Sequence, residues 1–247
     1  MVEPMNIEFR DRFLSLWRKY FNNAGLPIIF YYADETPIAT SPARCIINGL
    51  SSVFSGESLA CTGETVGCSG GKRYLGFAEG IRPNFEYFLS TGIPGKMKGE
   101  RYVKTPEMVR QIMANTPPFK APARYIVFKR WDTLEKTDKP EVVIFFATPD
   151  VLAGLFTLAR YDETRIDPVI APFGSGCSTI VQTPYLENKT DNPRAVIGMF
   201  DPSARIYVPA ETLSFAVPYK KFEQMAGNME ESFLTTEAWT NVQERIP

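Results

Sequence analysis

Two segments of the chain combine cysteine with glycine, and these residues are the best suited to chemistry. The first is residues 67–73 (GCSGGKR) and the second is residues 174–177 (GSGC). Glycine lets the backbone approach a ligand closely, and consecutive N–H groups in such turns form anion-binding hollows. We therefore predict that the two loops meet and present Cys68 and Cys177 to one ligand. The other residues predicted at this site are Ser69, Gly70, Gly71, Lys72, Arg73, Gly174 and Gly176.

The position of Cys177 at an expected helix start predicts a reactive thiol. A helix should follow Cys177 and end before Pro184. The positive end of the helix dipole lowers the pKa of a thiol there, and Lys72 or Arg73 would add to this effect. Cys45 is expected on a helix that begins at Ser41, so Cys177 should react faster than Cys45. The alternative interpretation is that these cysteines are small buried hydrophobic residues.

The cysteines also have to be considered as metal ligands, because the chain contains no histidine. This absence excludes Ser–His–Asp and Cys–His catalysis and every zinc site that uses imidazole. Six residues separate Cys61 from Cys68, and no Cys-x-x-Cys pair occurs. An iron–sulfur cluster or other thiolate-bound metal would require all four cysteines as ligands: Cys45, Cys61, Cys68 and Cys177.

Three functions are therefore compatible with the sequence. One is a small-ligand or cofactor-binding protein that holds a metal or an iron–sulfur cluster through thiolates. Another is an enzyme whose nucleophile is Cys177 or Cys68. The last is a non-catalytic module that binds a small anion through the glycine turns, Lys72 and Arg73.

Composition limits the partners and the location. The 247 residues are 44% hydrophobic and 22% charged, with a net charge of −1. No basic stripe predicts nucleic-acid binding, and no apolar stretch approaches the ~20 residues of a membrane span. The polar N-terminus does not look like a signal peptide. We expect a cytoplasmic protein with a small-molecule or anionic ligand, no nucleic-acid or membrane partner, and scope for homo-oligomers.

The pattern of apolar residues along the sequence predicts a mixed α/β chain, whose helices and strands must position these cysteines and glycines. Apolar runs indicate strands at residues 28–32, 125–128 and 141–147 (EVVIFFA), and the last is typical of a strand buried on both faces. Helices are predicted at residues 9–20 and after Thr105, Thr148 and Pro218. Strands at 195–200, 205–208 and 213–217 would form an antiparallel meander. The expectation is one α+β domain, residues 1–247, with a mixed sheet flanked by helices.

The chain resembles DUF169, a family of bacterial and archaeal proteins without an established function. The resemblance extends from about residue 30 to 239, and its most specific part is Cys68-Ser69-Gly70-Gly71 followed by Tyr74-Leu75-Gly76. Cys45 and Cys177 belong to it as well. Many members carry a Gly-Cys pair where this chain has Gly198-Met199. The resemblance supports Cys68 and Cys177 as site residues and implies no activity. If the family uses the cysteine of that pair as a ligand, this chain has either lost it or replaced it with Cys61.

Overall fold

The computed structural model describes residues 4–40, 42–116 and 118–246. These residues form one seven-stranded sheet with the order β2-β3-β1-β4-β7-β6-β5. All neighbouring strands are antiparallel except β5 and β6. The strands are β1 (Ile28–Ala33), β2 (Leu59–Cys61), β3 (Tyr125–Arg130), β4 (Val142–Ala147), β5 (Val169–Ile170), β6 (Ala195–Gly198) and β7 (Leu213–Pro218).

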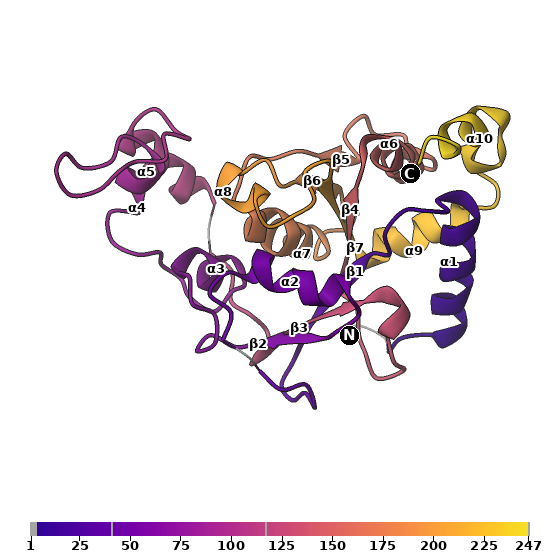
Figure 1. Ribbon diagram of the computed structural model, residues 1–247, viewed down its shortest axis with the longest axis horizontal. Coiled ribbons are helices and arrows are strands. Elements are labelled where there is room, and N and C mark those ends of the chain that lie inside the picture. The colour runs from indigo at the N-terminus through magenta and orange to yellow at the C-terminus, as the bar shows by residue number, and fades with distance from the viewer. Residues whose placement is uncertain (1–3, 41, 117, 247) are drawn as a thin grey trace.

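Helices cover both faces of the sheet, which separates them in the centre of Figure 1. The first face carries α1 (Ile7–Tyr20), η1 (Trp131–Thr133), α6 (Pro149–Arg160), α9 (Tyr219–Asn228), η3 (Phe233–Thr235) and α10 (Glu237–Gln243). The second face carries α2 (Ile46–Phe54), α3 (Ser69–Tyr74), η2 (Ser178–Gln182), α7 (Thr183–Glu187) and α8 (Pro202–Arg205). The predicted α+β class is therefore confirmed.

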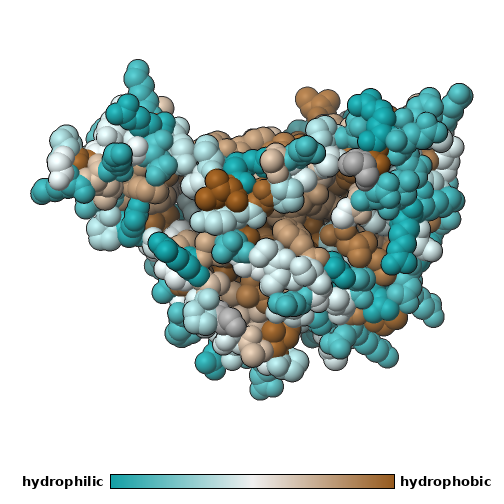
Figure 2. Space-filling view, viewed as in Figure 1, coloured by the Kyte–Doolittle hydropathy of each residue, from teal (hydrophilic) through white to brown (hydrophobic). Residues whose placement is uncertain are grey.

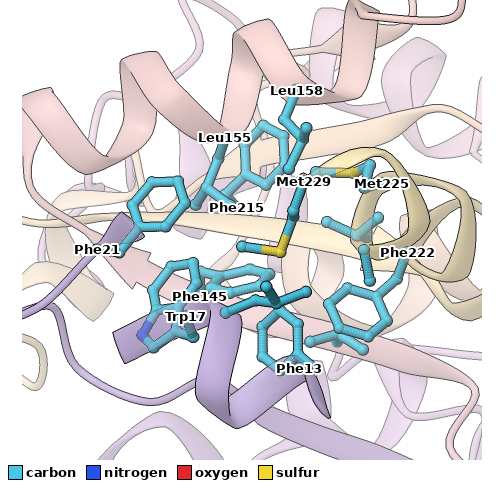
Figure 3. Packing of buried hydrophobic residues seen from close by; sticks show 14 of the residues in the cluster. Phe13, Trp17, Phe21, Phe145, Leu155, Leu158, Phe215, Phe222, Met225 and Met229 are labelled. Atoms are coloured by element: carbon cyan, nitrogen blue, oxygen red, sulfur yellow. The ribbon is translucent and has the colours of Figure 1, made fainter. Parts of the chain in front are cut away.

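Side chains of the central strands alternate between two cores. On β4, Val143 and Phe145 pack into the first core, and Val142 and Ile144 pack into the second. Successive side chains of β4 point to opposite faces, and neither face meets water. Both alternating sets of residues therefore have to be apolar, which explains the unbroken apolar run. The first core is rich in aromatic rings: Figure 3 shows Phe13, Phe21 and Phe145 around Trp17, and the rings of Phe13 and Phe21 stack on that of Trp17.

A lobe projects from the body at the left of Figure 1. It contains α4 (Phe85–Leu89) and α5 (Pro106–Asn115). Thr105 caps α5 by accepting a hydrogen bond from the backbone N–H of Met108, and Pro106 occupies the first turn. Hydrophilic residues cover much of the lobe surface (Figure 2).

Three local predictions were wrong. The proposed strand 205–208 is not formed: Asp201 caps a short helix, α8, and Arg205 donates hydrogen bonds to the carbonyls of Thr212 and Ala210. The last strands therefore form a β6–β7 pair rather than a three-stranded meander.

The expected helix after Cys177 does not end before Pro184. It begins as the π-helix η2 and continues as α7, whose second residue is Pro184. The helix expected to begin at Ser41, a position outside the described residues, has its first residue at Ile46.

Among the helices of the described ranges, none is both long enough and apolar enough to cross a membrane.

Candidate functional site

Three of the four cysteines lie at the start of a helix on the second face of the sheet. Cys45 immediately precedes α2, Cys68 precedes α3 and Cys177 precedes η2. Sequence analysis placed only Cys177 in such a position. All four cysteines are free thiols.

A parallel pairing brings Cys45 and Cys68 together. Ala43 pairs with Val66, and the backbone N–H of Gly67 donates to the carbonyl of Ala43 at 2.8 Å. This bridge is isolated, and each cysteine lies two residues beyond it, at the start of its helix. Gly67 makes the approach possible, because a Cβ there would lie 3.1 Å from the Cα of Arg44.

Tight packing at Gly176 brings Cys177 to the same place. A Cβ on Gly176 would lie 3.0 Å from the Cβ of Ala204 and 3.1 Å from Cγ1 of Ile47, in the first turn of α2. The electrostatic effects of the Cys68 and Cys45 thiols reach Cys177 and raise its pKa. We call Cys45, Cys68 and Cys177 the thiol cluster.

The three thiols differ in their exposure to solvent. Cys68 is exposed, Cys45 is half-buried and Cys177 is buried. Burial raises the pKa of Cys177 well above its ordinary value, and the neighbouring thiols and Asp201 add to the effect. The prediction that the helix start would lower this pKa is therefore wrong, because desolvation outweighs a helix end.

Cys68 has a different environment, in which a backbone donor faces its sulfur. The N–H of Gly71 donates to Sγ of Cys68 at 3.0 Å. Ser69 and Gly70 form the half-buried first turn of α3, and Gly174 lies beside Ser178 across the cluster. The hydroxyl of Tyr32 donates to the carbonyl of Leu75 at 2.9 Å and thereby fixes α3 on the sheet.

Asp201 and Tyr74 complete the surroundings of the cluster. Asp201 is 7% exposed and accepts hydrogen bonds from the N–H and Oγ of Ser203 at 2.9 and 2.8 Å. Burial raises the pKa of Tyr74; the charge of Arg73 opposes this shift, and Cys177 and Asp201 add to it. Sequence analysis missed both residues. The signal for Asp201 was its position before Pro202, which is typical of a helix cap as well as of a turn.

An aromatic contact between Tyr102 of the lobe and Phe173, which precedes η2, borders this region. The ring of Tyr102 contacts that of Phe173 at 6.2 Å between centroids. Burial and then the Asp201 carboxylate raise the pKa of Tyr102, which places that residue beside the same acidic group.

Cys61 and Arg73 do not take the positions that the sequence suggested. Cys61 is buried in β2 opposite Ile126, and burial alone raises its pKa to about 11. The guanidinium of Arg73 donates to the carbonyls of Glu79 and Thr116, so it links loops rather than facing a ligand. Lys72 acts electrostatically on Glu64.

The side chains as placed do not form a site for a single metal ion. Within residues 4–40, 42–116 and 118–246, no three Cys, Asp or Glu side chains are placed to hold one. The predicted ligand set of Cys45, Cys61, Cys68 and Cys177 is therefore divided: the structure brings three of these thiols together and leaves Cys61 in the core.

The fold is that of an α+β protein, and Cys45, Cys68 and Cys177 lie on one face of its mixed sheet. The model of the DUF169 family, described as "Uncharacterised ArCR", matches residues 22–228, and the chain belongs to this family. No curated protein and no solved structure matches the chain.

Proposed function

We propose that the protein is a cytoplasmic small-ligand or cofactor-binding protein whose occupant is held by the thiol cluster. The observation that carries the proposal is the meeting of Cys45, Cys68 and Cys177 from three separate helix starts. None of these thiols is used in a disulfide. Four free cysteines also suit a reducing compartment, which supports the cytoplasm as the location.

An iron–sulfur cluster is the occupant that suits this geometry best. Each iron of a cluster takes its own thiolate, so the sulfur atoms need not converge on one ion. Hydrogen bonds from backbone N–H groups to the sulfurs tune such clusters, and Gly71 already donates to Cys68. Metal binding would also displace the proton that burial keeps on Cys177. The cluster would be held by Cys45, Cys68 and Cys177 through three of its irons, and the remaining iron would take a non-cysteine ligand, so the four-cysteine set expected from the sequence would not be used.

Anaerobic purification tests the proposal. The protein, as isolated or after reconstitution with iron and sulfide, should absorb visible light and contain both elements in comparable amounts. Cys45→Ser, Cys68→Ser and Cys177→Ser should each lose most of the absorbance. Cys61→Ser is the matched control and should retain it, because Cys61 is packed in β2. A colourless, iron-free protein after reconstitution would contradict the cluster.

A thiol-dependent enzyme is the second candidate, and the exposure of Cys68 favours it over Cys177 as the nucleophile. The Gly71 N–H would stabilise a thiolate at Cys68. In this case the protein would be colourless, and a single alkylation at Cys68 would abolish its activity. Loss of activity on alkylation of Cys61 with Cys68 unmodified would contradict this assignment.

A further inference from the structure

The lobe contains a cavity that is separate from the thiol cluster. It has a volume of about 430 Å³ and is lined by Ser90, Thr91, Arg101, Val103 and Lys104. These residues belong to the segment that connects α4 to α5. The lining therefore combines two cationic side chains with two hydroxyl groups and contains no carboxylate.

The backbone of Arg101 is held in a conformation that its side chain disfavours. Its φ is 59°, in the left-handed region that glycine and asparagine occupy more readily. Three hydrogen bonds attach the segment to the end of α4: Glu100 to Phe88, Arg101 to Ser90 and Val103 to Leu89. These hydrogen bonds fix the backbone conformation at residue 101. An arginine in that conformation makes folding less favourable than a glycine would. Such outliers cluster at ligand-binding positions.

The charges around the cavity are unbalanced. Residues 80–120 contain seven lysines and arginines and three glutamates, whereas the whole chain has a net charge of −1. Arg110 pairs with Glu86 and Glu107, so two of the three local carboxylates are already neutralised. In the described part of the chain, Arg101 and Lys104 take part in no ion pair. Their charges are therefore available to an anion.

We infer that this cavity binds the phosphate group of a small molecule. A guanidinium offers paired N–H donors that match two phosphate oxygens, and an ammonium adds a point charge. Thr91 and Ser90 add hydroxyl groups at the wall. Ser90 is buried, and its hydroxyl donates to the carbonyl of Glu86 at 2.6 Å, which leaves its oxygen as an acceptor for a protonated phosphate or a sugar hydroxyl. This inference does not depend on the proposed function of the thiol cluster.

Calorimetric titration of the full chain with inorganic phosphate at low ionic strength tests the inference, with chloride as the reference anion. Phosphate should bind, and Arg101→Gly should weaken binding at least about tenfold, the effect expected from losing a charge-assisted pair. Lys104→Gln should weaken it several-fold. Lys136→Gln is the control, since it removes the charge of an exposed lysine outside the lobe and should leave binding unchanged.

Thermal unfolding separates lost binding from lost folding. Arg101→Gly should melt at or above the temperature of the unmodified protein, because glycine relieves the left-handed backbone. A phosphate monoester such as ribose 5-phosphate provides the second arm: tighter binding than inorganic phosphate indicates a phosphorylated metabolite, and equal binding indicates phosphate itself. The inference is overturned if phosphate gives no more heat than chloride, or if binding survives both Arg101→Gly and Lys104→Gln.

Discussion

The two faces of the sheet are built for different purposes. The first core packs long helices through aromatic contacts, with Phe13, Trp17, Phe21, Phe145 and Phe222 around one centre (Figure 3). The second core packs against short helices, and three of these begin at a cysteine. Longer helices bury a continuous apolar stripe, whereas helix starts expose backbone N–H groups.

The second face also contains the less usual interior groups. The hydroxyl of Ser214 is buried and has no hydrogen-bond partner within the described residues. A Cβ on Gly198 would lie 2.3 Å from Oγ1 of Thr179, and Met199 next to it has a φ of 66°. Within the described ranges, buried side-chain atoms without a partner also occur at Thr148 and Asn228, on helices of the first face, so the strained backbone at Met199 is what distinguishes the second face. We expect the first face to contribute most of the stability and the second to hold the proposed site.

The strongest test of this division is to remove a ring from the first core. Trp17 is 2% exposed and stacks on Phe21 with 4.3 Å between ring centroids. Trp17→Ala should reduce the free energy of unfolding in urea by ~3–5 kcal/mol, the usual cost of deleting a buried ring. Cysteine labelling of the still-folded protein should keep its order. Trp17→Phe is the control and should cost less. A loss below about 1 kcal/mol would show that this face is not the stabilising one.

A buried ion pair on the first face gives a smaller effect that depends on pH. Nζ of Lys221, whose side chain is 2% exposed, lies 2.8 Å from Oε1 of Glu163. Glu163→Gln leaves this lysine without its counter-charge and should cost ~3 kcal/mol. Replacing both residues, as Glu163→Gln with Lys221→Met, should recover part of the loss, because no buried charge remains.

The pH dependence of the same pair follows from Glu163. Hydrogen bonds from Arg165, and then from Lys221, lower its pKa from 4.5 to about 2. A folded pKa below the unfolded one gives stability that is complete above pH 4.5 and is lost as the pH falls toward 2. Urea unfolding at pH 6, 4 and 2.5 should show this loss in the unmodified protein and a flatter profile in Glu163→Gln. Parallel profiles would contradict the role of this carboxyl.

Much of the fold follows from patterns that are local in sequence. The apolar run 141–147 predicted the central strand, and Thr148-Pro149 predicted the start of α6. The prediction of a strand at residues 205–208 was wrong because Asp201-Pro202 is typical of both a turn and a helix cap. Only the hydrogen bonds from Arg205 to Thr212 and Ala210, which form in three dimensions, decide between them.

The thiol cluster was harder to predict, because its members are separated by long stretches of sequence. The composition of residues 67–73 singled out Cys68, and the glycines before Cys177 singled out the second segment. The neighbourhood of Cys45 depends on the Ala43–Val66 pairing, and that of Cys177 depends on Gly176 packing against α2 and α8. Burial is also a tertiary property, so no local pattern could decide between a reactive Cys177 and the alternative of a small buried hydrophobic residue, which the structure favours.

The smallest of the expected effects concerns the rates at which the cysteines of the second face react. A helix end contributes ~0.3–1 kcal/mol, less than the about 1.4 kcal/mol of one pKa unit. Burial raises the pKa of the Cys177 thiol well above its ordinary value, so desolvation should outweigh the helix end at this position. Timed alkylation of the metal-free native protein at pH 7.5, about one unit below the ordinary thiol pKa, followed by peptide mapping, should find Cys68 first, Cys45 next, and Cys177 and Cys61 last.

Denatured protein is the control for this experiment. All four cysteines should then react at similar rates, because unfolding removes the differences in burial. If Cys177 reacts as fast as Cys68 in the native protein, the helix start prevails over burial. The second face would then hold an activated nucleophile at Cys177, and the order of exposure would no longer explain the chemistry of the cluster.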